Sequence, residues 1–586
     1  IMIPGSANSL LLTSSGGGYE IERSLRFNSA DSAYLSRADS NGNRKTFTFS
    51  FWIKKVGTQF EWPTIISSTL DGNNGSQIRW NADRLQVYFL VGGNYGIQLL
   101  TNRVFRDYAG WLSVVLSVDT TKSTASDRCK MYINGVQETS FSASTYPSLN
   151  FDCSINVSGN TLNIGRRNYS SSNYIDGYLA DVHFIDGQAL APTDFGEFDD
   201  SGVWQPKLYT GGSYGTNGFH LTFSDNSNTT ATTLGKDTSG QGNNWDPIGF
   251  SIAAGTGNDS LTDVPTNYGT DTGSGGEVRG NFCTLNPLDK GSSVNLSNGN
   301  LTLVSGGVWQ YCYGTIGVSS GKWYWEQIMT TNTYTYTGVD HTPVTRQYPG
   351  YGANSWGYLS SNGIIYHANV SQINIGALGG SGAVIGIALD LDNLTLNYSF
   401  DGVWQASANP ATNANPQISN LPIGQVWLPA VDTYGATTHM NFGQKPFVHA
   451  APSGFKSLCT QNLPDPTIAD GSQYVGIVTF TGSSSGGSFS VPNFNPNFIW
   501  SKNRASSVNH ILQDDVRGFG NFGSMYSNLA LGDLDGNNGG TNNIMSVSGS
   551  TVNYGTNNNF TGSMVSWSWD AGTPGANEVG SYWQPA

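Results

Sequence analysis

The seven histidines of the chain are the first residues that could perform catalysis or bind a transition metal. Their spacing contains no His-Glu-x-x-His pair, and the sequence has no Gly-x-Ser-x-Gly turn that would present a nucleophilic serine ahead of a helix. The sequence therefore lacks the motifs that would indicate a metal hydrolase or a serine hydrolase. We predict that the protein is not an enzyme and that it uses no cofactor and no metal.

Paired carboxylates are a second source of hydrolytic chemistry, because a glycosidase needs two of them facing one sugar. Asp390, Asp392 and Asp401 flank the strands of one predicted hairpin and could supply such a pair. Aspartate also forms turns, since its side chain bonds to nearby backbone and Asp-Asn and Asp-Gly are typical turn sequences. The turn interpretation is favoured, and a polysaccharide-degrading enzyme is the weaker alternative.

Two loops, 71–75 and 533–538, hold enough aspartate and asparagine oxygens to suggest a calcium site. In the second loop, however, Asn538 stands where the EF-hand pattern needs glycine, and Ile544 stands where it needs a bidentate glutamate. Solvated turns explain both loops with the same residues.

Aromatic side chains give the best indication of a binding function, because a loop Trp or Tyr offers a flat face for sugars or protein partners. The chain has 16 Trp, 28 Tyr and 27 Phe residues. We predict ligand contacts for those near turn sequences, with core packing as the competing interpretation of each: Trp62, Trp80, Tyr95, Tyr351 and Trp404.

The composition is typical of β-proteins, with charged residues at 12% and 74 glycines in 586 residues. The net charge of −14 opposes binding to nucleic acid. No apolar run is long enough to span a membrane, and no export signal is visible. Five widely spaced cysteines form no Cys-x-x-Cys pair, so buried free thiols are favoured, with Cys129–Cys153 or Cys283–Cys312 as possible cross-strand pairs.

Alternating apolar residues predict strands over 46–53 and 112–118. Asn134-Gly135 predicts a tight hairpin turn, and the clearest hairpin joins 384–391 to 394–400. We predict an all-β protein of tandem β-sandwich (jelly-roll) domains joined by Gly/Ser/Asn-rich linkers. The predicted linker between the first two sandwiches is centred on 255–277.

The first block, 21–200, contains Phe47-Thr48-Phe49-Ser50-Phe51-Trp52, then Met131-Tyr132-Ile133-Asn134-Gly135, then Asp176-Gly177-Tyr178-Leu179-Ala180-Asp181. In this order the motifs resemble a laminin-G/concanavalin-A-like jelly roll. The resemblance implies a module that binds glycans or proteins. An N-terminal segment, 1–20, is a candidate anchor, and 201–280 is predicted to add one strand and then a linker.

The second block, 281–450, contains Gly321-Lys322-Trp323-Tyr324-Trp325-Glu326, then Leu396-Asn397-Tyr398-Ser399-Phe400-Asp401-Gly402, then Trp427-Leu428-Pro429-Ala430-Val431. These motifs resemble a SPRY domain, which implies a bent β-sandwich whose loops bind protein partners. Trp323, Trp325 and Trp356 are predicted to lie in its core. A linker is predicted over 451–473.

The third block, 474–586, includes Phe498-Ile499-Trp500-Ser501-Lys502-Asn503-Arg504 and Val565-Ser566-Trp567-Ser568-Trp569-Asp570. It resembles an uncharacterised β domain at the ends of marine tailed-phage structural proteins, and the three blocks together resemble large virion proteins of such phages. This resemblance implies a fibre, tail or capsid-surface protein for host attachment, located in the virion and extracellular after host lysis.

The implied partners are other virion proteins and a host cell-surface glycan or protein. Because sheet edges must be covered and no heptad stalk is present, a homo-oligomer formed by the sandwiches is expected, with a trimer the usual state of phage fibres. The alternative function is a bacterial extracellular glycan-binding or adhesion protein.

Overall fold

The computed structural model describes residues 18–57, 62–168, 172–199, 202–271, 277–330, 334–464, 468, 470–520, 524–529 and 543–572. Within these ranges the regular elements are β-strands and single turns of 3-10 helix, so the protein is all-β as predicted. Within the described residues, no helix is long and apolar enough to cross a membrane. Residues 1–17 of the candidate anchor, and the 533–538 loop, lie outside the described residues.

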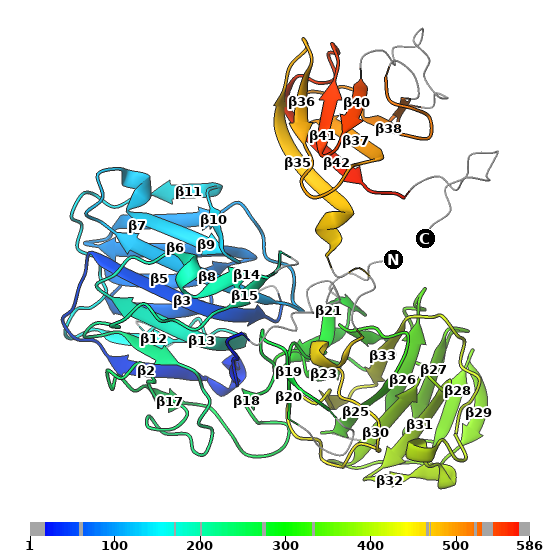
Figure 1. Ribbon diagram of the computed structural model, residues 1–586. Coiled ribbons are helices and arrows are strands. Elements are labelled where there is room, and N and C mark those ends of the chain that lie inside the picture. The colour runs from blue at the N-terminus through cyan, green and yellow to red at the C-terminus, as the bar shows by residue number, and fades with distance from the viewer. Residues whose placement is uncertain are drawn as a thin grey trace. The chain divides into compact units, whose positions relative to one another are not determined.

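The chain divides into two compact units, one comprising Ile1–Phe198 with Trp204–Asp465 and the other comprising Asp199–Val203 with Pro466–Ala586. The first unit contains two β-sandwiches, drawn in blue to cyan and in green to yellow in Figure 1. The second unit contains a smaller pair of sheets, drawn in orange to red. Single turns of 3-10 helix connect the strands: η2 (Ser29–Asp31), η3 (Ala125–Asp127), η4 (Pro192–Asp194), η5 (Gln405–Ser407), η6 (Pro410–Thr412), η7 (Thr460–Asn462) and η8 (Gly471–Gln473).

The first sandwich is built from two antiparallel sheets of eight strands each. One has the order β10 (Val136–Glu138), β9 (Cys129–Ile133), β8 (Trp111–Asp119), β3 (Thr46–Lys55), β13 (Gly177–Asp186), β1 (Ser24–Phe27) and β18 (Ser260–Leu261), with β16 (Phe219–Leu221) also paired to β13. The other has the order β11 (Phe141–Thr145), β7 (Asn94–Thr101), β6 (Arg84–Val91), β5 (Asn74–Asn81), β4 (Thr64–Asp71), β12 (Thr161–Ile164), β2 (Tyr34–Ala38) and β17 (Asp246–Ile248).

Strand alternation explains how these two sheets enclose a core. In β3, Phe47, Phe49 and Phe51 are buried in the core cluster, and each lies opposite an apolar residue of β8. Side chains of a strand point alternately to its two faces, so the residues between them lie on the other face. The sequence predictions for 46–53, for 112–118 and for the Asn134-Gly135 turn between β9 and β10 are confirmed.

The strand predicted to return to the first sandwich is present as β16, which pairs with β13. The rest of the segment differs from the predicted linker, because β17 and β18 pair with β2 and β1 and Trp245 is fully buried in the first core. Within 255–277, Asp259 pairs with Arg26 at 2.8 Å and Asp263 pairs with Lys54 at 2.8 Å, all four side chains being buried. Buried polar groups are stable when paired, so a polar segment can be an integral part of the fold.

The second sandwich has two sheets of seven strands each. One has the order β21 (Leu285–Lys290), β24 (Cys312–Gly314), β33 (Trp427–Thr433), β26 (Thr335–His341), β27 (Ser355–Leu359), β28 (Ile364–His367) and β29 (Val370–Asn374). The other has the order β22 (Val294–Ser297), β23 (Thr302–Ser305), β34 (Thr437–Asn441), β25 (Lys322–Met329), β30 (Val384–Asp390), β31 (Thr395–Phe400) and β32 (Val403–Trp404). Two short ribbons, β14 (Gly196–Phe198) with β15 (Trp204–Pro206) and β19 (Tyr268–Gly269) with β20 (Val278–Arg279), complete the first unit.

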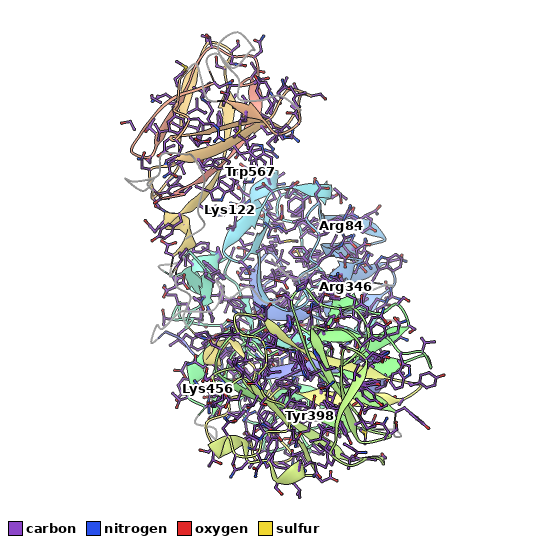
Figure 2. All side chains as sticks on the ribbon, turned by 90° about the vertical axis from the view of Figure 1, so that its right-hand side faces the viewer. Arg84, Lys122, Arg346, Tyr398, Lys456 and Trp567 are labelled. Carbon is purple, nitrogen blue, oxygen red and sulfur yellow. The ribbon has the colours of Figure 1, made fainter. Side chains whose placement is uncertain are left out.

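The predicted hairpin of the second sandwich is confirmed as β30 and β31, with Ile387 opposite Tyr398. Tyr398, labelled in Figure 2, is fully buried in this core together with Trp323 and Trp325. The sandwich extends into the predicted 451–473 linker, because Tyr324 donates its backbone N–H to the carbonyl of Lys456 at 2.9 Å.

The second unit packs a sheet of five strands on a sheet of three. The larger has the order β35 (Val475–Gly482), β42 (Gly562–Trp569), β37 (Phe498–Asn503), β38 (Ile511–Asp514) and β39 (Met525–Tyr526), and the smaller β36 (Gly487–Ser490), β41 (Thr551–Tyr554) and β40 (Ile544–Ser548). Their facing side chains form a small core that includes Ile499, Phe489 and Val552.

All five cysteines are buried and free, which confirms the favoured interpretation over cross-strand disulfides. Burial raises the pKa of Cys129 to about 12 and that of Cys283 to about 11. Thiols in this state are inert, because the thiolate is the reactive form.

Candidate functional site

The second sandwich carries a continuous aromatic surface, which we call the tyrosine surface. Tyr336 on β26 lies at its centre, with its ring centre 4.8 Å from that of Tyr348 and 5.0 Å from that of Trp309. Further rings extend the contacts outward, with Tyr434 at 5.3 Å from Trp309 and Tyr351 at 5.2 Å from Tyr348. The complete set is Trp309, Tyr334, Tyr336, Tyr348, Tyr351, Tyr366 and Tyr434.

The outer rings of the tyrosine surface are open to solvent. Tyr334, Tyr434 and Tyr351 are 51%, 46% and 44% exposed, whereas Tyr336 is buried beneath them. Strand β26 fixes the buried ring, and loops between strands present the exposed rings. Rigid rings with hydroxyl groups lose little entropy on binding, and they offer both a stacking face and hydrogen bonds to a ligand.

Asp432 of β33 holds the segment that carries Trp309. Its carboxylate accepts the backbone N–H of Gln310 at 2.6 Å and that of Thr433 at 2.7 Å. Burial raises the pKa of Asp432 to about 7, although these two hydrogen bonds favour the charged form. The support of the tyrosine surface therefore includes a carboxyl group that titrates near neutrality.

We expect Asp432 to make the stability of this sandwich depend on pH. A carboxyl whose pKa is raised by folding binds its proton more tightly in the native state, so stability falls as pH rises from about 4 to about 7. Asp432→Asn should remove this contribution, on the order of a few kcal/mol over that window. Thermal unfolding of wild type and variant at pH 5 and pH 8 checks this, and an identical pH dependence in both would contradict it.

The first sandwich carries a second, smaller surface, which we call the arginine patch: Trp62, Arg79, Tyr88 and Tyr95. The Arg79 guanidinium lies 4.3 Å from the ring centre of Tyr88 and 5.0 Å from that of Trp62. Gln86 accepts a hydrogen bond from Arg79 Nε at 2.9 Å and fixes its orientation. Trp62 and Tyr95 are each 48% exposed, so the patch presents two open rings over a nearly buried cation.

The structure distributes the predicted ligand-binding aromatics unevenly. Trp62 and Tyr95 lie in the arginine patch, and Tyr351 lies in the tyrosine surface. Trp404 is partly buried, with its ring edge toward Tyr324 at 6.4 Å.

The prediction for Trp80 is wrong: this side chain is 1% exposed and packs in the first core. Trp80 lies two residues after Ile78 on β5, so alternation points both side chains inward. Trp356 is buried in the second core, as predicted.

A buried cluster of two histidines and an aspartate escaped the sequence analysis. His183 of β13 and His220 of β16 lie opposite each other, with their rings stacked at 3.9 Å. A bulge in β13 gives Asp181 a φ of 51°, and its carboxylate lies 2.7 Å from His220 Nε2 and 3.2 Å from His183 Nε2. The Tyr19 hydroxyl donates to the same carboxylate at 2.9 Å.

The electrostatics of this cluster favour a shared carboxylate. Burial alone would raise the pKa of Asp181, but His183 and His220 hold it below its ordinary value. Burial and the neighbouring His220 lower the pKa of His183. The three groups place possible ligand atoms within 4.8 Å of one another, so they could approach a metal. His220 Nε2 hydrogen-bonds to the carboxylate, whereas His183 Nε2 lies 3.2 Å from it without a hydrogen bond and His183 Nδ1 contacts the Tyr214 hydroxyl at 2.9 Å.

The remaining candidate carboxylates hold turns. Asp390 accepts backbone N–H groups of Asp392 and Asn393 and pairs with Lys322 at 3.0 Å. Asp401 accepts the N–H of Val384. In the first calcium candidate, Asp71 accepts the N–H groups of Asn73 and Asn74. The contacts of Asp390 and Asp71 within their own turns are what the turn interpretation requires, whereas Asp401 and Asp392 bond to more distant backbone, at Val384 and Gly321.

Comparisons with known families match three segments of the chain. Residues 27–194 match the family described as the concanavalin A-like lectin/glucanases superfamily, and residues 322–445 match the SPRY domain. Residues 470–583 match a domain of unknown function, DUF7483. The protein therefore contains a concanavalin A-like domain, a SPRY domain and a C-terminal domain of that third family, and the first two point to a binding role.

Solved structures with similar segments include the SPRY domain of human HERC1, at 20% identity over 28% of this chain and 99% of that one, with a TM-score of 0.24. The PSpry domain of TRIM65 matches at 18% identity over 27% of this chain and 88% of that one, with a TM-score of 0.22. A heptameric SAP-like pentraxin from Limulus polyphemus matches at 14% identity over 30% of this chain and 80% of that one, with a TM-score of 0.23. None of the curated proteins matches the chain.

Proposed function

We propose that this chain is a non-enzymatic binding protein of a phage particle, a fibre, tail or capsid-surface component that attaches to glycan on the host cell surface. The observation that carries the proposal is the tyrosine surface. Its three most exposed rings are Tyr334, Tyr351 and Tyr434. Tyr351 and Tyr434 reach the buried Tyr336 ring through Tyr348 and Trp309, and Tyr334 packs against Tyr434. A sugar ring stacks on such faces, and the phenol hydroxyls are available to its hydroxyl groups.

The arginine patch gives the first sandwich a ligand surface of similar character. Trp62 and Tyr88 flank the Arg79 guanidinium, and Tyr95 packs edge-on against Tyr88. Gln86 and the Tyr88 hydroxyl orient the guanidinium through hydrogen bonds at 2.9 and 3.3 Å. An oriented cation between two rings suits an acidic sugar or another anionic group of a surface polysaccharide. Two separate surfaces on one chain would raise the avidity for a repeating polymer.

Two further features support a place in a virion. The order of the three sequence blocks resembles large virion proteins of marine phages. The five buried free thiols suit a protein that folds in a reducing cytoplasm and reaches the outside by lysis.

The experiment that tests this proposal is a glycan-array screen of the whole protein, followed by titration with the best ligand. We expect Tyr334→Ala combined with Tyr434→Ala to weaken binding at least about tenfold, because two stacking contacts are lost. Tyr474→Ala, which removes a comparably exposed ring from the second unit, should leave binding unchanged.

Tyr95→Ala separates the two surfaces, because it alters the arginine patch alone. Full binding by the double tyrosine variant would refute the tyrosine surface as the binding site. Release of shorter oligosaccharides from the ligand would refute the non-enzymatic assignment.

A further inference from the structure

The five-stranded sheet of the second unit has one face buried in its core and one apolar face that is half-buried at its centre and exposed along the edge strand β35. On the buried face, Ile499, Ser568 and Ile511 are no more than 1% exposed. Register places Trp500 opposite Trp567 and Phe498 opposite Trp569 on the other face. We call this other face the tryptophan face. It is formed by Val475, Ile477, Phe498, Trp500, Leu512, Met525, Val565, Trp567 and Trp569.

The tryptophan face is unusual for a protein surface. Ile477 and Val475 on β35 are 65% and 44% exposed. Trp567, labelled in Figure 2, packs at 5.3 Å from Trp500, and Phe498 packs at 5.1 Å from Trp569. Asp514 lies opposite Phe498 on this face and is buried in an ion pair with Arg517, whereas Ile477, Trp567, Trp500 and Leu512 form a row without charge. Contiguous apolar surface of this kind on a folded protein marks an interaction site.

The unpaired edge of this sheet also indicates an interaction site. Among the described strands, β35 pairs only with β42, so its other edge presents free backbone groups. Its sequence, Val-Gly-Ile-Val-Thr-Phe-Thr-Gly, contains neither a charge nor proline. Natural proteins protect exposed edges with charges, proline or bulges, or cover them with another element. A protein partner therefore suits this sheet better than a sugar does.

The charges at the two ends of the tryptophan face identify that partner. Lys502 lies opposite Val565 at one end, and Asp570 follows Trp569 at the other end. Because Val565 and Trp569 are separated by four residues along one strand, the two ends are about 13 Å apart at the strand rise. A second copy of the same face, related by a two-fold axis across the strands, brings each Lys502 against the opposing Asp570. The face is thus complementary to itself.

A hollow at the acidic end gives the second copy a place to insert a side chain. Phe498, Trp569, Asp570 and Ala571 line a space of about 350 Å³ that is open to solvent. Its walls are mostly aromatic, so an apolar side chain of the second copy suits it.

We propose that the chain self-associates through the tryptophan face, with a second copy of the same chain as the occupant. The inference is independent of the proposed glycan binding, because it rests on the other unit. Light scattering of the full chain after size exclusion should give a multiple of the 62.7 kDa chain mass. Ile477→Asp buries a charge in the interface and should give the mass of a single chain.

Matched variants make the test specific. Val403→Asp alters a strand residue of the first unit that is also 65% exposed, and it should leave the oligomer intact. Lys502→Asp should weaken association at least about tenfold, and the exchange Lys502→Asp with Asp570→Lys should restore it.

Two results would overturn the inference: a single-chain mass for the wild-type protein at tens of micromolar, or an unchanged mass for Ile477→Asp. The first would assign the face to another partner or to another part of the same chain. The second would place self-association elsewhere on the molecule.

Discussion

Asp263→Ala is expected to destabilise the first unit by about 3–5 kcal/mol, because it leaves a buried cation without its partner. Lys54 Nζ lies 2.8 Å from the Asp263 carboxylate, and neither side chain is exposed. Trp111 donates its Nε1–H to the same carboxylate at 3.0 Å, so the variant also leaves an indole unpaired. Lys54 further donates to Asn281 at 2.7 Å, which joins the two sandwiches. Chemical denaturation of wild type and variant measures the loss.

A double variant separates the loss of the ion pair from simple damage to packing. Lys54→Met with Asp263→Leu removes both charges and fills the space, and such replacements of buried pairs are often close to neutral. We expect the double variant to recover most of the stability that Asp263→Ala loses. A loss of less than about 1 kcal/mol in the single variant would show that water reaches Lys54 in solution.

Trp80→Ala is expected to destabilise the first sandwich by about 3–5 kcal/mol, the usual result of removing a large aromatic side chain from a core. The Trp80 ring packs at 5.6 Å from Phe105 and lies under the Lys55 ammonium at 5.0 Å. Trp62→Ala is the matched control, because Trp62 is 48% exposed and should cost less than about 1 kcal/mol. Thermal and chemical unfolding of both variants provide the comparison.

The same two variants distinguish a core role from a ligand role. Trp80→Ala should leave ligand affinity unchanged at a temperature where it is folded, whereas Trp62→Ala should weaken binding to the arginine patch. Equal stability of the two variants would contradict the placement of Trp80 in the core.

Strands and hairpins were predictable from sequence because their signals are local. Phe47, Phe49 and Phe51 alternate within ten residues, and the β30–β31 hairpin has turn residues between two apolar strands. Trp80 shows that a position beside a turn does not by itself predict an exposed side chain. Trp80 lies next to the Asn81-Ala82-Asp83 turn, yet it is on the same face of β5 as Ile78, so its side chain points into the core.

The segment 255–277 was wrongly predicted to be a linker because the side chains that it buries are polar. Asp259 pairs with Arg26 and Asp263 pairs with Lys54, and the two residues of each pair lie more than 200 positions apart in the sequence. The spacing of apolar residues along the sequence does not reveal such pairs. The histidine cluster is similar: Asp181-x-His183 was visible in the sequence, but His220 joins it through the pairing of β16 with β13.

The tyrosine surface was predictable only in part, through Tyr351. Its other rings come from strands β26 and β28 and from loops that follow separate strands between residues 309 and 434. Only the order of the strands in the sheet, with β33, β26, β27 and β28 side by side, brings these segments together. Each aromatic taken alone has a core interpretation that is at least as good.

We propose that this protein recognises surface carbohydrate through the tyrosine surface without cleaving it. The most direct measurement is the titration of one array-selected polysaccharide with the wild-type protein and with the Tyr334→Ala, Tyr434→Ala double variant, with the polymer length recorded before and after. We predict saturable binding by the wild type, an affinity at least about tenfold weaker for the variant, and an unchanged polymer length. Equal affinity of the two proteins, or a shortened polymer, would contradict this account.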